Sequence, residues 1–120
     1  MPQKINLEAK FQLVHDHWHP HVIAACNGQE VKIAKVQGEF VWHDHAQEDE
    51  LFMVIKGKLT LEFEDHHVDL HPGEILVVPR GVRHRPVAEE ETWILLFEPA
   101  HIAHTGGVDS PLRVDTPKRI

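Results

Sequence analysis

The sequence lacks several features that define particular classes of protein. Cysteine occurs once, as Cys26, which excludes an internal disulfide and is typical of a reducing compartment. The longest uninterrupted apolar runs, such as Val22–Cys26 and Trp93–Phe97, contain five residues, whereas a transmembrane helix needs about 20. The first residues contain no apolar segment of the kind found in a secretory signal. These absences predict a cytoplasmic protein without a membrane partner.

Basic side chains are also scarce. The chain has 12 Lys and Arg against 19 Asp and Glu, which gives a formal net charge of −7. Nucleic acids and anionic membrane surfaces are bound through basic surfaces, so we expect neither as a partner. At 120 residues, with 42% hydrophobic and 26% charged residues, the chain has the composition of one globular domain.

Histidine is the residue in excess. The chain contains 12 histidines, although tyrosine is absent. Imidazole is the commonest side-chain ligand of metals and titrates near neutral pH. The question for function is therefore which of these histidines act together.

Short apolar runs separated by turn residues predict an all-β fold. Asn27-Gly28, between Val22–Cys26 and Gln29–Val36, is a strong hairpin signal. The run Leu59–Glu64 alternates apolar and polar residues, as a half-buried strand does. The remaining predicted strands are Phe40–His43, Leu51–Ile55, His66–Leu70, Ile75–Val78, Val82–Val87 and Thr92–Glu98. About eight strands at this spacing predict a sandwich or a barrel.

The two ends of the chain are expected to differ from its centre. Residues 1–30 form an N-terminal segment that contributes strands to the barrel or to a dimer, and residues 6–14 within it form a short helix capped by Asn6. Residues 31–98 form the barrel core. Residues 99–120, with a Gly-Gly pair and two prolines, form an extended and partly disordered tail.

Four residues in the centre have the types and spacing of a metal site. His43 and His45 lie on one face of an extended strand, roughly 6.6–6.8 Å apart at the backbone. Glu50 adds a carboxylate from the next strand, and His84 adds a third imidazole after the turn at residues 79–81. Three imidazoles and one carboxylate suit Fe, Mn, Co, Ni, Cu or Zn better than Ca²⁺ or Mg²⁺. We therefore predict one divalent transition metal, of unknown identity.

Other arrangements remain open. The same four residues could form a polar cluster without a metal, and Glu48 is a rival to Glu50 because it has the same strand parity. A second histidine run would line one face of a strand and bind an ion by itself, or else lie on the surface; it consists of His15, His17, His19 and His21. The remaining histidines are expected to be exposed: His66, His67, His71, His101 and His104.

The metal-site residues fall in a pattern that resembles the cupin superfamily. That superfamily has two motifs, G-x5-H-x-H-x3,4-E-x6-G and G-x5-P-x-G-x2-H-x3-N. The matching residues are His43, His45, Glu50 and Gly57 in the first motif and Gly73, Pro79, Gly81 and His84 in the second. Two positions depart from the pattern: four residues instead of five separate Gly38 from His43, and Ala88 replaces the final Asn. Neither departure removes a metal ligand.

The resemblance, which covers residues 31–98, implies a small antiparallel jelly-roll β-barrel with a metal in its interior. Within the superfamily, the chain looks like the small single-domain proteins named for their likeness to the cupin part of mannose-6-phosphate isomerase. Three functions stay open, with catalytic residues unknown. One is a metal-dependent enzyme of oxygenase, isomerase or lyase type that acts on a small metal-chelating substrate. The others are a metal-binding or ligand-sensing module without turnover, and a structural dimer.

Strand parity extends this interpretation to the surface. If Glu50 faces inward, its strand places Phe52 and Val54 in the interior and an apolar row outside, consisting of Leu51, Met53 and Ile55. Such a row needs a cover. We expect a homodimer, or alternatively an N-terminal segment that folds back. The pocket is expected to be mostly apolar, with no lysine or further acid facing it.

Overall fold

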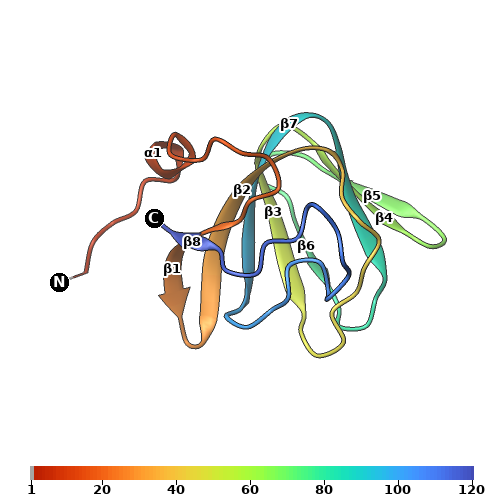
Figure 1. The fold of residues 1–120 in the computed structure, drawn as a ribbon. Coiled ribbons are helices and arrows are strands. Elements are labelled where there is room, and N and C mark those ends of the chain that lie inside the picture. The colour runs from red at the N-terminus through yellow and green to blue at the C-terminus, as the bar shows by residue number, and fades with distance from the viewer. Residues whose placement is uncertain (1) are drawn as a thin grey trace.

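A computed structural model, which describes residues 2–120, shows an antiparallel β-structure with one short helix (Figure 1). The elements in chain order are α1 (Leu7–Phe11), β1 (His21–Cys26), β2 (Gln29–Glu39), β3 (Glu50–Lys56), β4 (Leu59–Phe63), β5 (His67–Leu70), β6 (Ile75–Val78), β7 (His84–Pro99) and β8 (Lys118–Arg119). Apart from the short parallel pair of β1 and β8, all strand pairs are antiparallel. The prediction of an all-β jelly roll is confirmed.

Strand β7 joins the two layers of the fold. Its second half pairs with β2 on one side and with β3 on the other, and β6 continues this layer beyond β3. Its first half pairs with β4, which in turn pairs with β5. Because one strand serves both layers, their inner faces enclose a common interior. The sharp bend of β7 at the top of Figure 1 marks the crossing.

The structure contains the predicted turn between β1 and β2, but it lacks a predicted break between two strands. Asn27 and Gly28 have φ angles of 53° and 79° and close the predicted hairpin between β1 and β2. The break expected between Val82–Val87 and Thr92–Glu98 is wrong, because β7 continues through the exposed acidic residues 89–91. Exposed charges here mark the outer side of a bend rather than a loop.

The strand predicted over Phe40–His43 is also wrong. Phe40 donates a backbone hydrogen bond to Pro86, and His43 forms an isolated bridge with His84, but no continuous ladder connects these points. The carbonyl of Val41 instead accepts a hydrogen bond from the His43 ring. Because this segment does not pair continuously with the sheet, the ring of His43 is directed inward.

The main core lies between the two layers. On β3, Phe52 and Val54 are buried, whereas Leu51, Met53 and Ile55 are only half-buried, as strand parity predicts. The core consists of Trp18, Ala34, Val36, Phe40, Phe52, Val54, Leu59, Leu61, Leu70, Val78, Ala88, Ile94 and Leu96. Fully burying one large apolar side chain of this kind stabilises a fold by about 1.5–3 kcal/mol.

A second apolar cluster lies on the outer face, under helix α1. The amide of Ala9 donates to Oδ1 of Asn6, which is the predicted cap, but the helix is shorter than expected and ends at Phe11. The ring of Phe11 is fully buried and stacks on Trp93 at a centroid distance of 4.7 Å. Ile55 packs against the same cluster. The N-terminal segment therefore covers one end of the outward row.

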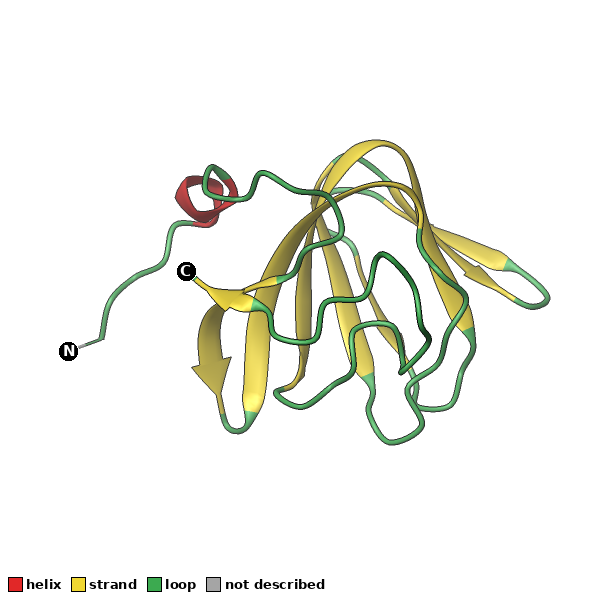
Figure 2. Ribbon diagram, viewed as in Figure 1, coloured by secondary structure: helices red, strands yellow, loops and turns green. Residues whose placement is uncertain are grey.

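Residues 100–117 connect β7 to β8 through turns and loops that cross in front of the strands (Figures 1 and 2). Thr105 is buried, and its hydroxyl donates to the carbonyl of Val108 at 2.6 Å. Gly106 has a φ of 64° and lies so close to the carbonyl of Asp44 that a Cβ atom would clash. Within residues 2–120, no helix is long and apolar enough to cross a membrane.

The packing of Phe11 on Trp93 generates a stability prediction. Phe11→Ala should lower the free energy of unfolding by about 3–5 kcal/mol, because it removes a fully buried ring and leaves a cavity. Leu13→Ala is the matched control: Leu13 is 54% exposed, so the change should stay within about 0.5 kcal/mol. Urea unfolding monitored by tryptophan fluorescence measures both. Equal effects would show that α1 does not pack on the sheet in solution.

Candidate metal centre

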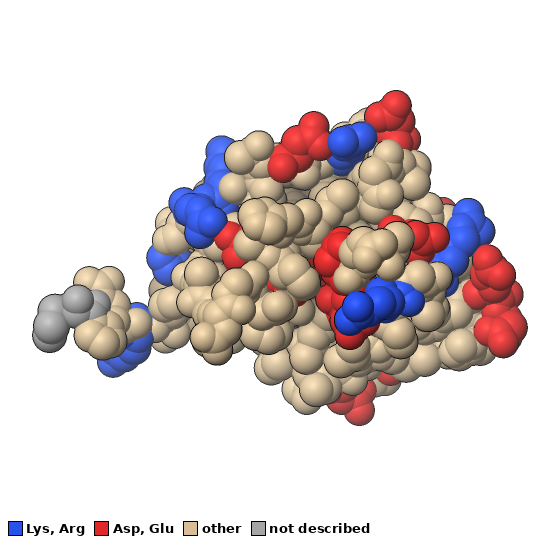
Figure 3. All heavy atoms as spheres, turned by 90° about the horizontal axis from the view of Figure 1, so that it is seen from below, with Lys and Arg blue, Asp and Glu red and all other residues tan. Residues whose placement is uncertain are grey.

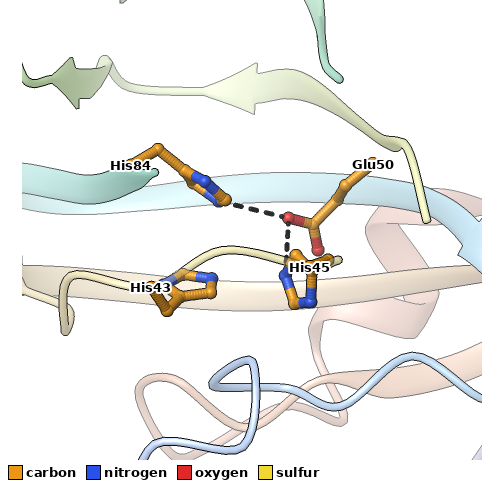
Figure 4. Close-up of side chains that lie close together, drawn as sticks. All are labelled: His43, His45, Glu50 and His84. Atoms are coloured by element: carbon orange, nitrogen blue, oxygen red, sulfur yellow. Dashed lines mark ion pairs between the residues drawn. The ribbon is translucent and has the colours of Figure 1, made fainter. Parts of the chain in front are cut away.

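Four buried side chains converge inside the barrel: His43, His45, Glu50 and His84. One nitrogen or oxygen of each lies within 4.8 Å of the corresponding atom of every other. Oε1 of Glu50 is 3.5 Å from Nε2 of His45 and 3.5 Å from Nε2 of His84 (Figure 4). The structure thus brings together the four residues that the sequence singled out, and these four side chains form the metal group. The rival Glu48 is half-buried and lies outside this group.

Short backbone contacts fix the segments that carry these side chains. Glu50 begins β3 and His84 begins β7. His43 and His84 exchange two backbone hydrogen bonds of 3.0 and 2.9 Å, and the amide of Gly81 donates to the carbonyl of His45 at 2.9 Å. The side chain of Asp49 accepts a hydrogen bond of 2.8 Å from the amide of Arg80. The loop before β3 and the loop before β7 are therefore held to each other on both sides of the site.

Backbone carbonyls set the tautomers of two rings. Nδ1 of His43 lies 2.8 Å from the carbonyl of Val41, and Nδ1 of His84 lies 2.9 Å from the carbonyl of Val82. A carbonyl oxygen can only accept, so each Nδ1 carries the proton and each Nε2 keeps its lone pair. In both cases the lone pair is available on the ring nitrogen opposite the anchored one. This is the arrangement of a histidine prepared to bind a metal.

The atoms that face one another are also unsatisfied. Among the described residues, Nε2 of His45, Nε2 of His84 and Oε1 of Glu50 are buried without a hydrogen-bond partner. A buried polar atom left in this state destabilises a fold by about 1–3 kcal/mol. A single cation accepts lone pairs from all of these atoms at once. Imidazole and carboxylate donors fit a borderline transition metal such as Fe, Mn, Co, Ni, Cu or Zn.

The electrostatics of the group agree with ligands in their deprotonated forms. Burial, together with the neighbouring His84, lowers the pKa of His43 to about 4. Burial raises the pKa of Glu50, but the neighbouring polar groups of Glu98, His45 and His84 outweigh this effect and hold that pKa well below its usual range. At neutral pH the group therefore contains an ionised carboxylate next to a neutral His43 ring.

Sequence analysis missed a charged pair behind Glu50. Lys32 and Glu98 are both 3% exposed, and Nζ of Lys32 lies 2.9 Å from Oε1 of Glu98. Burial and the neighbouring Glu50 raise the pKa of Glu98 well above its usual range, and Oε2 of Glu98 is buried without a hydrogen-bond partner. Glu30 lies 3.8 Å from Lys32 and is bound at 2.5 Å by the exposed Arg119. A line of polar groups thus runs from the metal group to the surface.

A cavity of about 30 Å³ adjoins two of the four side chains, His43 and Glu50. Its walls are mainly apolar, as predicted: Trp18, Pro20, Ala34, Val36, Phe40, Phe52, Pro86 and Ile94, together with His43, Glu50 and His104. One water needs about 10–15 Å³ of such space, so the cavity accepts about two water-sized groups. His104 was expected to be exposed, but it is half-buried in this wall because the segment 100–117 folds over the barrel.

The histidine run near the N-terminus does not converge in this way. His15, His17 and His19 are exposed. Nε2 of His17 pairs with Glu91 at 2.8 Å, and Nδ1 of the buried His21 lies 2.7 Å from the carbonyl of His19. Within residues 2–120, the four central side chains are the only group with the geometry to hold an ion.

Arginines near the site are directed away from the metal group. The guanidinium groups of Arg83 and Arg85 lie over the ring of Trp42, at 5.2 and 5.4 Å, and Arg85 also pairs with Glu62. Arg80 pairs with Asp49 at the loop end. Seen from below, the molecule shows acidic and basic side chains close to one another (Figure 3). Opposite charges around the loops thus compensate one another.

Known proteins share both the fold and the sequence of this region. Residues 29–98 match the cupin domain family. A cupin-2 domain containing protein from Shewanella frigidimarina NCIMB 400 is 48% identical, with a TM-score of 0.78 over 79% of this chain and 93% of that chain. Protein NMB1881 from Neisseria meningitidis is 28% identical, with a TM-score of 0.75 over 82% of this chain and 100% of that chain.

A curated relative is the uncharacterized protein YdbB of Bacillus subtilis (strain 168), which is 38% identical over 64 residues. That match covers 52% of this chain and 57% of YdbB, so it spans little more than half of the relative's length. The family match extends from β2 to β7 and contains all four side chains of the metal group. The chain belongs to the cupin family.

Proposed function

We propose that the chain binds one divalent transition metal through His43, His45, Glu50 and His84 and acts as a metal-dependent enzyme on a small chelating molecule. The observation that carries this proposal is the set of buried, unpartnered atoms of His45, Glu50 and His84, which face one another. The tautomers of His43 and His84 support it, since both Nε2 atoms keep their lone pairs.

The surroundings favour some reaction classes over others. A bound metal would supply Lewis-acid or redox chemistry to an oxygen atom of the substrate. The apolar walls exclude water, and the ionised Glu50 is held in place by its neighbours. Apart from the ligands and His104, the side chains that line the cavity include no acid or base. This lining supports an oxygenase reaction better than a lyase or isomerase reaction, because both of the latter move protons to or from carbon.

A binding or sensing module without turnover is the second candidate, and the size of the cavity favours it. Room for about two water-sized groups accommodates a small anion but only part of a chelating organic substrate. Turnover therefore requires the rest of such a substrate to lie outside this cavity. Product formation with any chelating substrate decides between the two functions.

Elemental analysis tests the metal site directly. Untagged protein should contain about one equivalent of transition metal per chain, because the described residues form one group of four side chains that could hold an ion. His84→Ala leaves three ligands and should lower metal affinity at least about tenfold. His17→Ala is the control, since this exposed residue pairs with Glu91 away from the site. Full metal content in a variant that lacks all four side chains would contradict the assignment.

Acid should destabilise the metal-free protein in a defined range. The pKa of His43 and of His104 is lowered by burial to about 4, from about 6.5 in an unfolded chain. The unfolded chain then takes up protons first as the pH falls below about 6.5. The free energy of unfolding should fall by about 1.4 kcal/mol per pH unit for each ring until about pH 4.

Urea unfolding in the presence of a chelator, at pH values from 7.5 to about 4, measures this slope. The double variant His43→Phe, His104→Phe should lose most of it, and His101→Phe, which alters an exposed ring, should retain it. Added metal should raise the unfolding free energy at neutral pH by mass action, and this gain should shrink on acidification. Equal slopes in all variants would show that neither ring is responsible.

We also propose that the chain forms a homodimer through the outer face of β3, β6 and β7. Strand register places Leu51 between Val77 and Phe97, and Met53 next to Ile75. Ile75 and Val77 are 58% and 49% exposed. The apolar cluster under helix α1 covers Ile55, Trp93 and Leu95 at one end of this surface. A contiguous apolar face on an edge strand of this kind supports association with a second copy.

Sedimentation equilibrium tests the dimer. The chain should sediment at twice its mass of 13.8 kDa, and Val77→Glu should weaken association at least about tenfold, since it buries a charge in the contact. Val108→Glu is the matched control, because Val108 is 39% exposed on the C-terminal segment. Sedimentation of the unaltered protein at 13.8 kDa over all concentrations would refute the dimer.

A further inference from the structure

The segment between β7 and β8 brings one further polar side chain to the cavity at the metal group. His104 lines this cavity together with His43 and Glu50. Its ring lies 4.8 Å from the ring of Phe40, and Phe40 in turn lies 5.4 Å from the ring of His43. Because His104 lies beyond residue 98, it is outside the part of the chain that matches the family.

The backbone fixes which nitrogen of His104 carries the proton. The amide of Val114 donates a hydrogen bond of 3.1 Å to Nδ1 of the ring. An atom that accepts from an amide cannot itself carry a proton, so in the neutral ring the proton is on Nε2. Burial lowers the pKa of His104 to about 4, so the ring is neutral at pH 7. Nε2–H is therefore a hydrogen-bond donor.

This donor has no acceptor within the described part of the chain, since the only hydrogen bond of the His104 ring is the one at Nδ1. The other side-chain N–H groups in the cavity wall are already used. Nε1 of Trp18 donates to the carbonyl of Gln37 at 2.9 Å, and Nδ1 of His43 donates to Val41. In an otherwise apolar wall, His104 is thus the one side chain among those described that is free to donate to a ligand.

Neighbouring contacts hold this ring over the metal group. Thr105, the next residue, is buried and closes a turn through its hydrogen bond to Val108. Gly106 lies against the carbonyl of Asp44, which is the residue between His43 and His45. The segment therefore rests on the same stretch of chain that supplies two of the four proposed ligands.

We propose that His104 is a positioning residue that donates a hydrogen bond from Nε2 to a small anionic or carbonyl-type ligand held at the metal group. The proposal rests on the proposed function, because it requires a metal to hold the ligand. It names a ligand class: molecules that present a hydrogen-bond acceptor to the cavity, with no more than a few atoms in that space. Protonated or purely apolar molecules of equal size are disfavoured, because they leave Nε2–H buried without a partner.

Azide binding to the Co²⁺-loaded protein tests this inference, with visible absorption as the readout. Three variants are compared with the unaltered chain. His104→Phe keeps the ring against Phe40 but has no donor, and His104→Gln has an amide that can donate. His101→Phe is the control, because His101 is exposed on the same segment. We expect azide affinity to fall about tenfold in His104→Phe, to recover largely in His104→Gln, and to remain unchanged in His101→Phe.

A measurement without metal completes the test. Long-range ¹H–¹⁵N spectra of the metal-free protein should show the His104 ring neutral at pH 7, with its proton on Nε2. A proton on Nδ1 would overturn the proposal, because the donor would then be absent.

The outcomes separate the two proposals. Failure of the unaltered chain to bind Co²⁺ would overturn both the metal site and the role of His104. One equivalent of Co²⁺ in every protein, with equal azide affinity in His104→Phe, would overturn only the role of His104. Loss of Co²⁺ from His104→Phe would also overturn it, since the residue would then support the metal site rather than a ligand.

Discussion

A carboxylate enclosed in the interior of a small barrel is the constraint on which the rest of this structure depends. Burying an ionised group without compensation costs several kcal/mol, so Glu50 requires partners on every side. His45 and His84 approach its Oε1 from one side at 3.5 Å. Glu98 is a further buried neighbour, and Nζ of Lys32 holds its Oε1 at 2.9 Å. A divalent cation would complete this arrangement, because it satisfies the lone pairs that the protein groups leave unpaired.

Strand β7 makes this convergence possible. It carries His84 at its start, in the layer with β4, and Glu98 near its end, in the layer with β2 and β3. Residues far apart in the sequence therefore meet around Glu50 on regular backbone rather than on free loops. The two other residues of the group, His43 and His45, lie on an irregular segment, but backbone hydrogen bonds from His84 and Gly81 anchor both of them. Strands and anchored loops thus hold the four side chains in place before any ligand arrives.

Sequence reasoning found the parts of this structure that depend on local pattern. Spacing and strand parity identified the four central residues and the inward direction of Phe52 and Val54. It missed Lys32 and Glu98, although both share the parity of inward neighbours on their strands. On β2, buried and exposed residues do not alternate regularly. Ile33 faces outward but is fully buried, because α1 packs over it. His104 could not be found locally, since tertiary contacts such as the one between Gly106 and Asp44 bring its segment over the barrel.

The segment 100–117 connects the size of the cavity with its chemistry. It supplies His104 to the wall of the cavity of about 30 Å³ that adjoins His43 and Glu50. Few groups hold it there: Thr105 is its buried side chain, Leu112 packs against the core, and β8 pairs with β1 over two residues. Segments with few buried contacts open locally at a lower free energy than global unfolding requires. A larger ligand could therefore enter by displacing this segment, but it would lose the hydrogen bond from His104 in doing so. Size selection and hydrogen-bond selection are thus coupled in one element, and a ligand gains both only if it fits beneath the closed segment.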